Sequence, residues 1–592
     1  MADIGKRARH SQESEEKMTV GKIAILFALA GSQTIWAQTW TITKVVDNTT
    51  ACPGSSNGYF NVAGSAVSAI NGPWVVFEDT GDDNCTADDG QSIWSYNLIT
   101  QALVKLVDTS TPIPEGVGNF ESFGALGENL QVNNGTVVFH GSGSGYDPAT
   151  GCSDGLYTVS VVGGKIYRVV DYTMTLPGYG GNYCHLGTSY GINGLLGISI
   201  ERGKVVFSAE AVGGPSANGG VWWAPANVNT TEADLHLIAD MSTPYTTPFN
   251  AIIDSWSGGF IGATGIAFTG GGQIGGAGLF VNSPSTPILL SSYVLPGDTA
   301  HDTTYPDDAS YYIGPVVDGS NIFFIASDPF YQGTCGNGGG TGTGAFTGVF
   351  RTGLTGGTAT SIMNTCNTLP NGDPLNGPNS FNQLAANEGT AVFMVTDNTT
   401  GGYVLDSSIN GVLSEILAPG DALPTGASCN GANHATGCAT VVSPPGTGGI
   451  NGGRVVFNAE GGPYWYDEGI YVASLPCAAS VTKDVYITLG SLTYSSTTKL
   501  WSQTATVANP GTTGIAGPLS LVLADLTSHV TLANRNGTTV CFSPEGSPYI
   551  DLYVSSNNKL PAGTSTKITL EFSDPSDAGI AFTSEVARAG AR

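Results

Sequence analysis

The sequence has few charged residues, and few of those are basic. Asp, Glu, Lys and Arg make up 11% of the 592 residues, and 20 Lys and Arg stand against 47 Asp and Glu, which gives a net charge of −27 at neutral pH. Sequence-independent binding of nucleic acid needs Lys and Arg to displace counterions from phosphates, and anionic membranes attract basic segments. The composition therefore argues against both partners and favours cations or a neutral partner such as a glycan.

Catalytic motifs are also missing. The seven histidines are scattered without an H-E-x-x-H pair, no Gly-rich phosphate loop precedes a helix, and no Asp-box of the sialidase type is present. Gly187–Gly191 matches G-x-S-x-G, but a nucleophile elbow needs a strand-to-helix turn in an α/β sheet. A carboxylate pair such as Asp82 and Glu115 stays open for glycan cleavage, because sequence alone gives no separation between them.

A long apolar run occurs only near the N-terminus. Lys22, the apolar run Ile23–Ala30 and then Ile35-Trp36-Ala37 have the order of a secretion signal and its cleavage site. Residues 1–37 are therefore predicted to be a leader and signal peptide, with Met18 as a possible true start. A short membrane anchor is the alternative, although the run is short for a span. We expect a secreted or cell-surface protein without a membrane span after cleavage.

A strand ending in phenylalanine recurs seven times. The phenylalanines lie 62, 68, 61, 56, 69 and 64 residues apart, a near-constant period that is typical of repeat architectures. A weaker strand precedes each one, and a Gly-rich loop and a second strand follow it. A further recurring strand ends the early units, as in Leu103–Asp108 and Ile166–Asp171. The seven residues are Phe77, Phe139, Phe207, Phe268, Phe324, Phe393 and Phe457.

Four strands per unit, repeated seven times, predict an all-β fold with a seven-bladed β-propeller over residues 38–476. The seventh unit passes from Gly469–Val472 directly to Pro476-Cys477 without its last strand. The segment Ile42–Asp47 has the sequence of that strand but no unit before it. We therefore expect this N-terminal strand to complete the last blade, which closes the ring and covers a bare sheet edge.

The repeat resembles the TolB-type propeller repeat, which also pairs a V-x-F-like strand with a G-x-Y-like strand. The residues that carry the resemblance are Val205–Ala209 with Gly220–Trp223, and Val455–Ala459 with Gly469–Val472. The units are also similar to those of poorly characterised secreted bacterial propeller proteins. The resemblance covers about residues 40–475, and it implies the fold but hardly any function, because one fold hosts many activities.

After Cys477 the pattern changes to short segments that alternate apolar and polar residues between turn signals. This pattern predicts an Ig-like β-sandwich domain over residues 477–592. The segment resembles an Ig-like module that is common on secreted bacterial proteins, and the matching stretches are Ala516–Leu523, Gly546–Tyr549 and Leu570–Phe572.

Ten cysteines in an exported chain predict up to five disulfides. Eight of them map to loops on one propeller face, where the middle-strand and inter-blade loops are long. No Cys-x-x-Cys pair is present, so a cysteine-bound metal is not expected. Their connectivity is not fixed by sequence, but spacing favours the pairs Cys52–Cys85, Cys152–Cys184, Cys335–Cys366, Cys429–Cys438 and Cys477–Cys541.

Acidic residues crowd one middle-strand loop on this face. Oxygen-rich loops suit calcium, whereas a solvated acidic loop is the alternative because the D-x-D-x-D-G spacing is absent. By contrast, the aspartates that end the outer strands are expected to cap turns. The candidate calcium ligands are Asp79, Asp82, Asp83, Asp88 and Asp89, and the expected turn caps are Asp47, Asp108, Asp171 and Asp240.

Aromatic residues on the same loops are candidates for binding a ligand. Exposed rings stack on sugar faces and anchor interfaces, and packing within the long loops is the alternative. The candidate ligand-binding residues are Tyr146, Tyr179, Tyr183, Tyr331, Trp465 and Tyr466.

The long loops on one propeller face and the missing catalytic motifs favour a secreted, non-enzymatic binding protein. We expect it to be a monomer whose propeller face recognises a glycan or an extracellular protein. Two alternatives stay open. One is a carboxylate-based glycan-cleaving enzyme, either a hydrolase or a lyase. The other is a structural component of the cell surface or matrix that uses the sandwich for docking.

Deletion of residues 38–48 tests the predicted closure. If Ile42–Asp47 completes the last blade, its loss removes a strand from the ring, so the melting temperature and the protease resistance of the whole repeat region should fall. Calorimetry and limited proteolysis measure the two effects. An unchanged melting temperature would mean that the segment is only a frayed end.

Overall fold

The computed structural model describes residues 40–591 apart from 55–57, 63–67, 82–84, 86–89, 124–129, 144–152, 179–181, 185–196, 213–218, 240–244, 247–251, 254, 263–264, 272–277, 291–292, 299–310, 319–320, 329–345, 371–374, 376–380, 388, 397–402, 410–411, 420, 422, 425–438, 444–447, 462–467, 553, 555–558 and 575–578. The predicted signal peptide lies outside these residues. Across the described part of the chain, no helix is long and apolar enough to cross a membrane.

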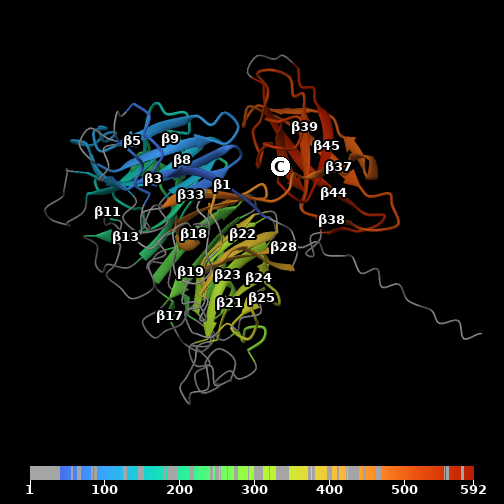
Figure 1. Cartoon of the computed structure of the whole chain (residues 1–592), viewed down its shortest axis with the longest axis horizontal. Coiled ribbons are helices and arrows are strands. Elements are labelled where there is room, and N and C mark those ends of the chain that lie inside the picture. Colours follow the sequence, from blue (N-terminus) through green and yellow to red (C-terminus); the bar gives the residue numbers. More distant parts are fainter. Residues whose placement is uncertain are drawn as a thin grey trace, which may run out of the picture. The chain divides into compact units, whose positions relative to one another are not determined.

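The protein is all-β, with a propeller-like series of four-stranded antiparallel sheets followed by C-terminal sheets (Figure 1). The first sheet shows the pattern: its strands β2 (Ser68–Asn71), β3 (Trp74–Asp79), β4 (Ser92–Asn97) and β5 (Leu103–Asp108) pair in chain order. In some later sheets, two short strands together occupy the position that β2 has in the first sheet.

The later sheets of the series contain the following strands, in chain order: β6 (Phe120–Phe123), β7 (Leu130–Asn133), β8 (Thr136–Gly143), β9 (Asp154–Ser160) and β10 (Tyr167–Asp171); β11 (Asn182–Cys184), β12 (Ile198–Glu201), β13 (Lys204–Val212), β14 (Gly219–Pro225) and β15 (His236–Ala239); β18 (Ser255–Gly262), β19 (Gly265–Gly271), β20 (Gly278–Val281) and β21 (Ser283–Leu290); β22 (Tyr311–Asp318), β23 (Asn321–Asp328), β24 (Phe346–Gly353) and β25 (Thr360–Asn364); β26 (Phe381–Asn387), β27 (Thr390–Thr396), β28 (Tyr403–Ile409) and β29 (Val412–Leu417). A separate short hairpin joins β16 (Tyr245–Thr246) and β17 (Ile252–Ile253).

The last sheet of the series takes one strand from the N-terminal side of the chain. It contains β30 (Ala439–Ser443), β31 (Ile450–Asn451), β32 (Arg454–Gly461), β33 (Gly469–Ser474) and β1 (Thr41–Asp47). β1 pairs antiparallel with β33 from Thr41 opposite Ser474 to Asp47 opposite Gly469. Figure 1 shows the blue strand β1 beside the orange strand β33. The predicted partner of Ile42–Asp47 is therefore present.

The recurring phenylalanines form the core of these sheets. All seven lie in the second strand of their sheet and have 0% exposure, which confirms the predicted repeat. Both faces of a sheet are buried: in β3, Val75 and Phe77 pack with Val456 of the last sheet, whereas Val76 packs with Val137 of the next sheet. Burial on both sides explains why these strands are almost continuously apolar rather than alternating.

The aspartates at the ends of outer strands cap turns, as predicted. One Asp47 carboxylate oxygen accepts hydrogen bonds from the Thr49 backbone N–H at 3.1 Å and the Thr50 hydroxyl at 2.7 Å, and the other pairs with Lys44 at 2.8 Å. Asp108 and Asp171 repeat this arrangement with a basic residue three positions earlier. Asp240 lies outside the described residues.

The C-terminal sheets share one apolar core of their own. One sheet contains β34 (Ala479–Ser480), β39 (Leu519–Ala524), β41 (Gly537–Thr538), β42 (Pro548–Leu552) and β45 (Thr583–Arg588), and the other contains β35 (Tyr486–Leu489), β36 (Thr493–Ser495), β37 (Leu500–Ala508), β40 (Thr531–Leu532) and β44 (Ser565–Ser573). A short pair joins β38 (Ile515–Ala516) and β43 (Lys559–Leu560). Leu521, Leu570 and Val586 are fully buried in the core between the sheets. Both C-terminal sheets therefore contribute to one common core.

Two acidic residues lie directly opposite each other on β28 and β29. Asp406 is paired with Glu415 in the strand register and has 0% exposure. Neither oxygen of the Asp406 carboxyl has a hydrogen-bond partner among the described residues. Burial, together with the charge of Glu415, raises the pKa of Asp406 to about 8. Burial and the neighbouring Glu415 thus both favour the neutral form of the Asp406 carboxyl in the folded protein.

Substituting Asp406→Asn should change how stability depends on pH. Because the pKa of Asp406 is about 8 in the folded chain and roughly 4 in the unfolded chain, the unfolded chain releases this proton first as pH rises. The wild-type protein should therefore lose stability between about pH 4 and pH 8, by up to ~1.4 kcal/mol per pH unit from this group. Asp406→Asn removes that contribution.

Urea unfolding at several pH values measures the effect of Asp406→Asn. The difference in unfolding free energy between variant and wild type should move in favour of the variant as pH increases. Asp525→Asn, at an exposed position of the C-terminal sheets, serves as the matched control and should leave the profile unchanged. Parallel profiles for Asp406→Asn and wild type would contradict the raised pKa.

Candidate functional site

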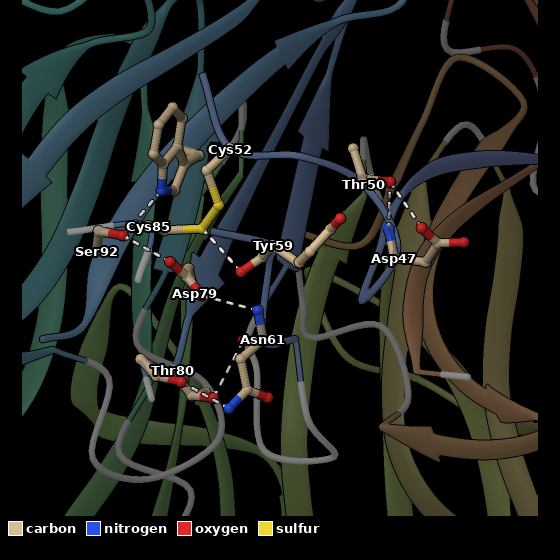
Figure 2. The surroundings of a disulfide bond; sticks show 11 residues. Asp47, Thr50, Cys52, Tyr59, Asn61, Asp79, Thr80, Cys85 and Ser92 are labelled. Carbon is tan, nitrogen blue, oxygen red and sulfur yellow. Dashed lines mark hydrogen bonds between the residues drawn. A yellow bond between two sulfur atoms is a disulfide. The ribbon is translucent and has the colours of Figure 1, made fainter. Parts of the chain in front are cut away.

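A disulfide joins the segment after β1 to the loop between β3 and β4. Cys52 and Cys85 are bonded, with their Cα atoms 5.3 Å apart, and both are buried (Figure 2). The backbone around Cys52 is also fixed, because its N–H donates to the Gly58 carbonyl at 3.0 Å and the Phe60 N–H donates to the Thr50 carbonyl at 3.2 Å. This bond was predicted, and it holds the loops at this end of the first sheet in place.

Asp79, a predicted calcium ligand, points into the protein instead of into solvent. It ends β3 with 0% exposure, and its carboxylate accepts hydrogen bonds from the Asn61 backbone N–H and the Ser92 hydroxyl, both at 3.0 Å. Figure 2 shows Asp79 between these two groups. The Trp94 indole N–H also donates to the Ser92 hydroxyl oxygen, at 2.8 Å. Burial raises the pKa of Asp79, and these hydrogen bonds partly offset the rise.

The other calcium candidates, Asp82, Asp83, Asp88 and Asp89, lie outside the described residues. Within the described ranges, no group of three or more His, Cys, Asp or Glu residues is placed to hold a metal ion. Asp79 therefore links the 50–61 segment to β4, and calcium binding by this loop stays a prediction.

Of the six predicted ligand-binding aromatics, only Tyr183 lies among the described residues. It belongs to β11, has 0% exposure, and packs edge-on against Phe207 with ring centroids 5.9 Å apart. Burial raises the pKa of its hydroxyl well above the ordinary value. Tyr183 thus packs inside the sheet, as the alternative interpretation allowed. The remaining candidates lie outside the described residues, and they are Tyr146, Tyr179, Tyr331, Trp465 and Tyr466.

An exposed aromatic residue that the sequence analysis missed is Tyr59. Its residue exposure is 49%, and its backbone bridges to Ala51 beside the disulfide. The adjacent Phe60 points inward, with its ring 5.6 Å from Phe77 and 5.1 Å from Trp94. In the sequence, adjacent Tyr and Phe residues near a cysteine could have indicated one outward-facing and one inward-facing ring.

The other predicted disulfides are described in part. Cys477 and Cys541 are bonded, with Cα atoms 5.6 Å apart, as expected. Cys366 is also in a disulfide. Cys184 ends β11, but its side chain is not described. The other cysteines, Cys152, Cys335, Cys429 and Cys438, fall outside the described residues.

A polar cavity lies where the first strands of the sheets end. Its volume is about 110 Å³, and it is lined from every sheet of the series and by Asn536 of the C-terminal sheets. Each sheet places one residue at the same position, six residues before its buried phenylalanine, and this constant offset is a sequence signal that was missed. These residues are Asn71, Asn133, Glu201, Gly262, Asp318, Asn387 and Asn451.

Most of these equivalent side chains bond to the first turn of the next sheet. Asn71 accepts from the Asn134 N–H at 3.0 Å, and Asn387 accepts from the Gly452 N–H at 3.0 Å. The Asn451 carbonyl oxygen accepts from the Gly72 N–H at 2.8 Å, across 379 residues of sequence. The last sheet is therefore bonded to the first by the same contact that joins consecutive sheets.

Glu201 brings a carboxyl group into this cavity. Burial raises its pKa to about 7, although Arg202 and a hydrogen bond from the Asn133 amide at 2.7 Å favour the charged form. Asp318 lines the same cavity and accepts from the Gly389 N–H at 2.5 Å. Both carboxyl groups thus take part in contacts between sheets.

The C-terminal sheets reach the same end of the series. The Asn71 amide donates to the Asn536 carbonyl at 3.4 Å, and the Asn134 amide donates to the Arg535 carbonyl at 3.2 Å. The Tyr549 hydroxyl donates to the Asn451 carbonyl oxygen at 3.3 Å. The turns beside the cavity are therefore in contact with the C-terminal sheets.

Removing the Asp79 side chain should destabilise the protein. Asp79→Ala leaves the Asn61 N–H and the Ser92 hydroxyl without their buried acceptor, so we expect a loss of roughly 2–3 kcal/mol in unfolding free energy. Chemical denaturation measures it. Glu545→Ala, at an exposed position, is the control and should be neutral. A neutral Asp79→Ala would show that the carboxylate does not hold these loops together.

No family model matches the sequence, and no curated protein does either. The propeller domain of the trilobed protease from Pyrococcus furiosus is similar in structure, with 9% identity, a TM-score of 0.35 and coverage of 70% of this chain and 95% of that one. The Pyrococcus horikoshii acylaminoacyl peptidase (9%, TM-score 0.37, 76% and 61%) and the Trypanosoma rangeli sialidase (9%, TM-score 0.31, 83% and 93%) are also similar. These values carry no argument about activity, and the strand pairings themselves define the propeller-like fold.

Proposed function

We propose that residues 38–476 form a seven-bladed β-propeller closed by β1, and that residues 477–592 are an Ig-like sandwich domain. Two observations support the closure. β1 pairs with β33 at the far end of the repeat region, and the contact from Asn451 to Gly72 returns the series of inter-sheet hydrogen bonds to its first member.

We further propose that the protein is a secreted, non-enzymatic binding protein. Its propeller face with the long middle-strand and inter-blade loops recognises a glycan or an extracellular protein. The observation that carries this proposal is the position of the sandwich contacts. Asn71 and Asp79 lie at opposite ends of the first sheet, and the sandwich contacts the Asn71 end. The end with the Cys52–Cys85 bond and the exposed Tyr59 is therefore the end that is left for a ligand.

Binding fits the described residues better than glycan cleavage. Glu201 and Asp318 are carboxyl groups beside the central cavity, but its volume of about 110 Å³ is well below the roughly 300–1,000 Å³ of ordinary ligand pockets. Asn536 of the sandwich also lines it. By contrast, a partly exposed tyrosine with a fixed backbone supplies apolar area and a hydroxyl at low entropic cost.

Tyr59→Ala tests this function in two assays, a glycan array and a pull-down of extracellular proteins. A ligand found with the full chain should bind Tyr59→Ala about five- to thirtyfold more weakly, as for a central aromatic contact. Tyr494→Ala is the matched control, because Tyr494 has a similar exposure of 48% but belongs to the sandwich. Failure to find any ligand at millimolar concentration, or equal losses in both variants, would contradict the proposal.

A further inference from the structure

The C-terminal sandwich contacts the series of sheets at a particular place, the junction between its last and first members. From these contacts we propose that the sandwich is a clasp that holds the propeller ring shut. This inference rests on the ring closure proposed above, and it gives the sandwich a role that is separate from ligand binding. The junction is defined here by the turns at Asn71-Gly72 and Asn451-Gly452-Gly453.

One atom takes part in both the closure and the docking. The carbonyl oxygen of the Asn451 side chain accepts the Gly72 N–H at 2.8 Å and the Tyr549 hydroxyl at 3.3 Å. An amide oxygen has two lone pairs, so it can satisfy both donors at once. Asn451 has 5% exposure and Tyr549 has 0%. Releasing the sandwich would therefore expose to water the hydrogen bond that joins the last sheet to the first.

The clasp extends to the second sheet. Asn71 of the first sheet accepts from the Asn134 N–H through its side-chain oxygen and donates to the Asn536 carbonyl through its side-chain nitrogen. The Asn134 amide in turn donates to the neighbouring Arg535 carbonyl. Two consecutive carbonyls of the sandwich thus bind two consecutive sheets, and they do so beside the hydrogen bond that connects those sheets.

Glycine allows the close approach at this junction. Gly72 has φ +56°, and a Cβ atom there would lie 3.2 Å from the Thr538 hydroxyl oxygen. Gly453 has φ +72°, and a Cβ atom would lie 2.6 Å from the Gly590 carbonyl oxygen. The corresponding Gly203 of the third sheet has no atom within 4 Å of its Cβ position. The sandwich therefore lies directly against the turns at Gly72 and Gly453, but not against the turn at Gly203.

The chain itself keeps the sandwich near the junction. β33 of the last sheet ends at Ser474, and the Pro476 carbonyl already accepts the Ala591 N–H at 2.8 Å. The disulfide between Cys477 and Cys541 ties the same lead-in segment to the sandwich. Because the module is tethered to the last sheet, its contacts with the first and second sheets form at a high effective concentration.

Hydrogen exchange of the full chain, resolved to single amides by fragmentation, tests the clasp. Thr538→Arg places a long charged side chain against Gly72 and should undock the sandwich, and Thr531→Arg makes the same change at an exposed position of the same module. Tyr549→Phe removes only the hydroxyl, with Tyr494→Phe as its control. The Gly72 N–H reports the junction, whereas the Gly389 N–H reports an equivalent contact, to Asp318, elsewhere in the series.

The clasp predicts faster exchange at Gly72 in both junction variants, by about two- to tenfold for Tyr549→Phe, which loses one hydrogen bond, and by more for Thr538→Arg. Gly389 and both control variants should match the wild type. Unchanged exchange at Gly72 in both junction variants, or equal acceleration at Gly72 and Gly389, would overturn the clasp. If the Gly72 amide and the β1 amides exchanged without protection in the wild type, this result would instead overturn the ring closure itself.

Discussion

The structure depends on the fact that its four-stranded sheets are apolar on both faces. Each such sheet needs a neighbouring sheet on both faces. Without one, its uncovered face would remain in water at a cost of roughly 25 cal/mol for each Å² of apolar surface. The first sheet meets this constraint with partners on each side: Val75 and Phe77 pack toward the last sheet, and Val76 packs toward the second. Packing of the last sheet against the first in this way also brings the Asn451 side chain within reach of the Gly72 N–H.

The two ends of the sheets consequently differ in what they can do. At the end where the first strands finish, amide side chains are engaged in bonds between sheets and in bonds to the sandwich, so that end is committed to holding the architecture. At the other end, Asp79 and the Cys52–Cys85 bond fix the loops from within and leave Tyr59 facing outward. The buried contacts inside these loops thus fix their backbone, while Tyr59 is exposed on their surface.

The repeat and its strand order could be predicted because they depend on local patterns, above all the spacing of the phenylalanines. The partner of β1 could also be predicted, since a surplus strand and a missing one have few other solutions. The spacing of the cysteines favoured the two disulfides Cys52–Cys85 and Cys477–Cys541, although it did not fix them. The inward direction of the Asp79 side chain could not be predicted, because it depends on Asn61 and Ser92, which the fold brings beside it. Tyr183 was assigned to a loop, although it lies in a strand of three residues that no periodicity could reveal.

The position of β1 also has a consequence for how the chain folds. β1 is synthesised before every other described strand, but its partner β33 lies at the far end of the repeat region, with Thr41 opposite Ser474. Contacts of such high sequence separation are slow to form, because the loop must close before the contact is made. Within the series of sheets, the first strand made is thus the last to be paired, and its unpaired edge needs protection from other chains until β33 has been synthesised.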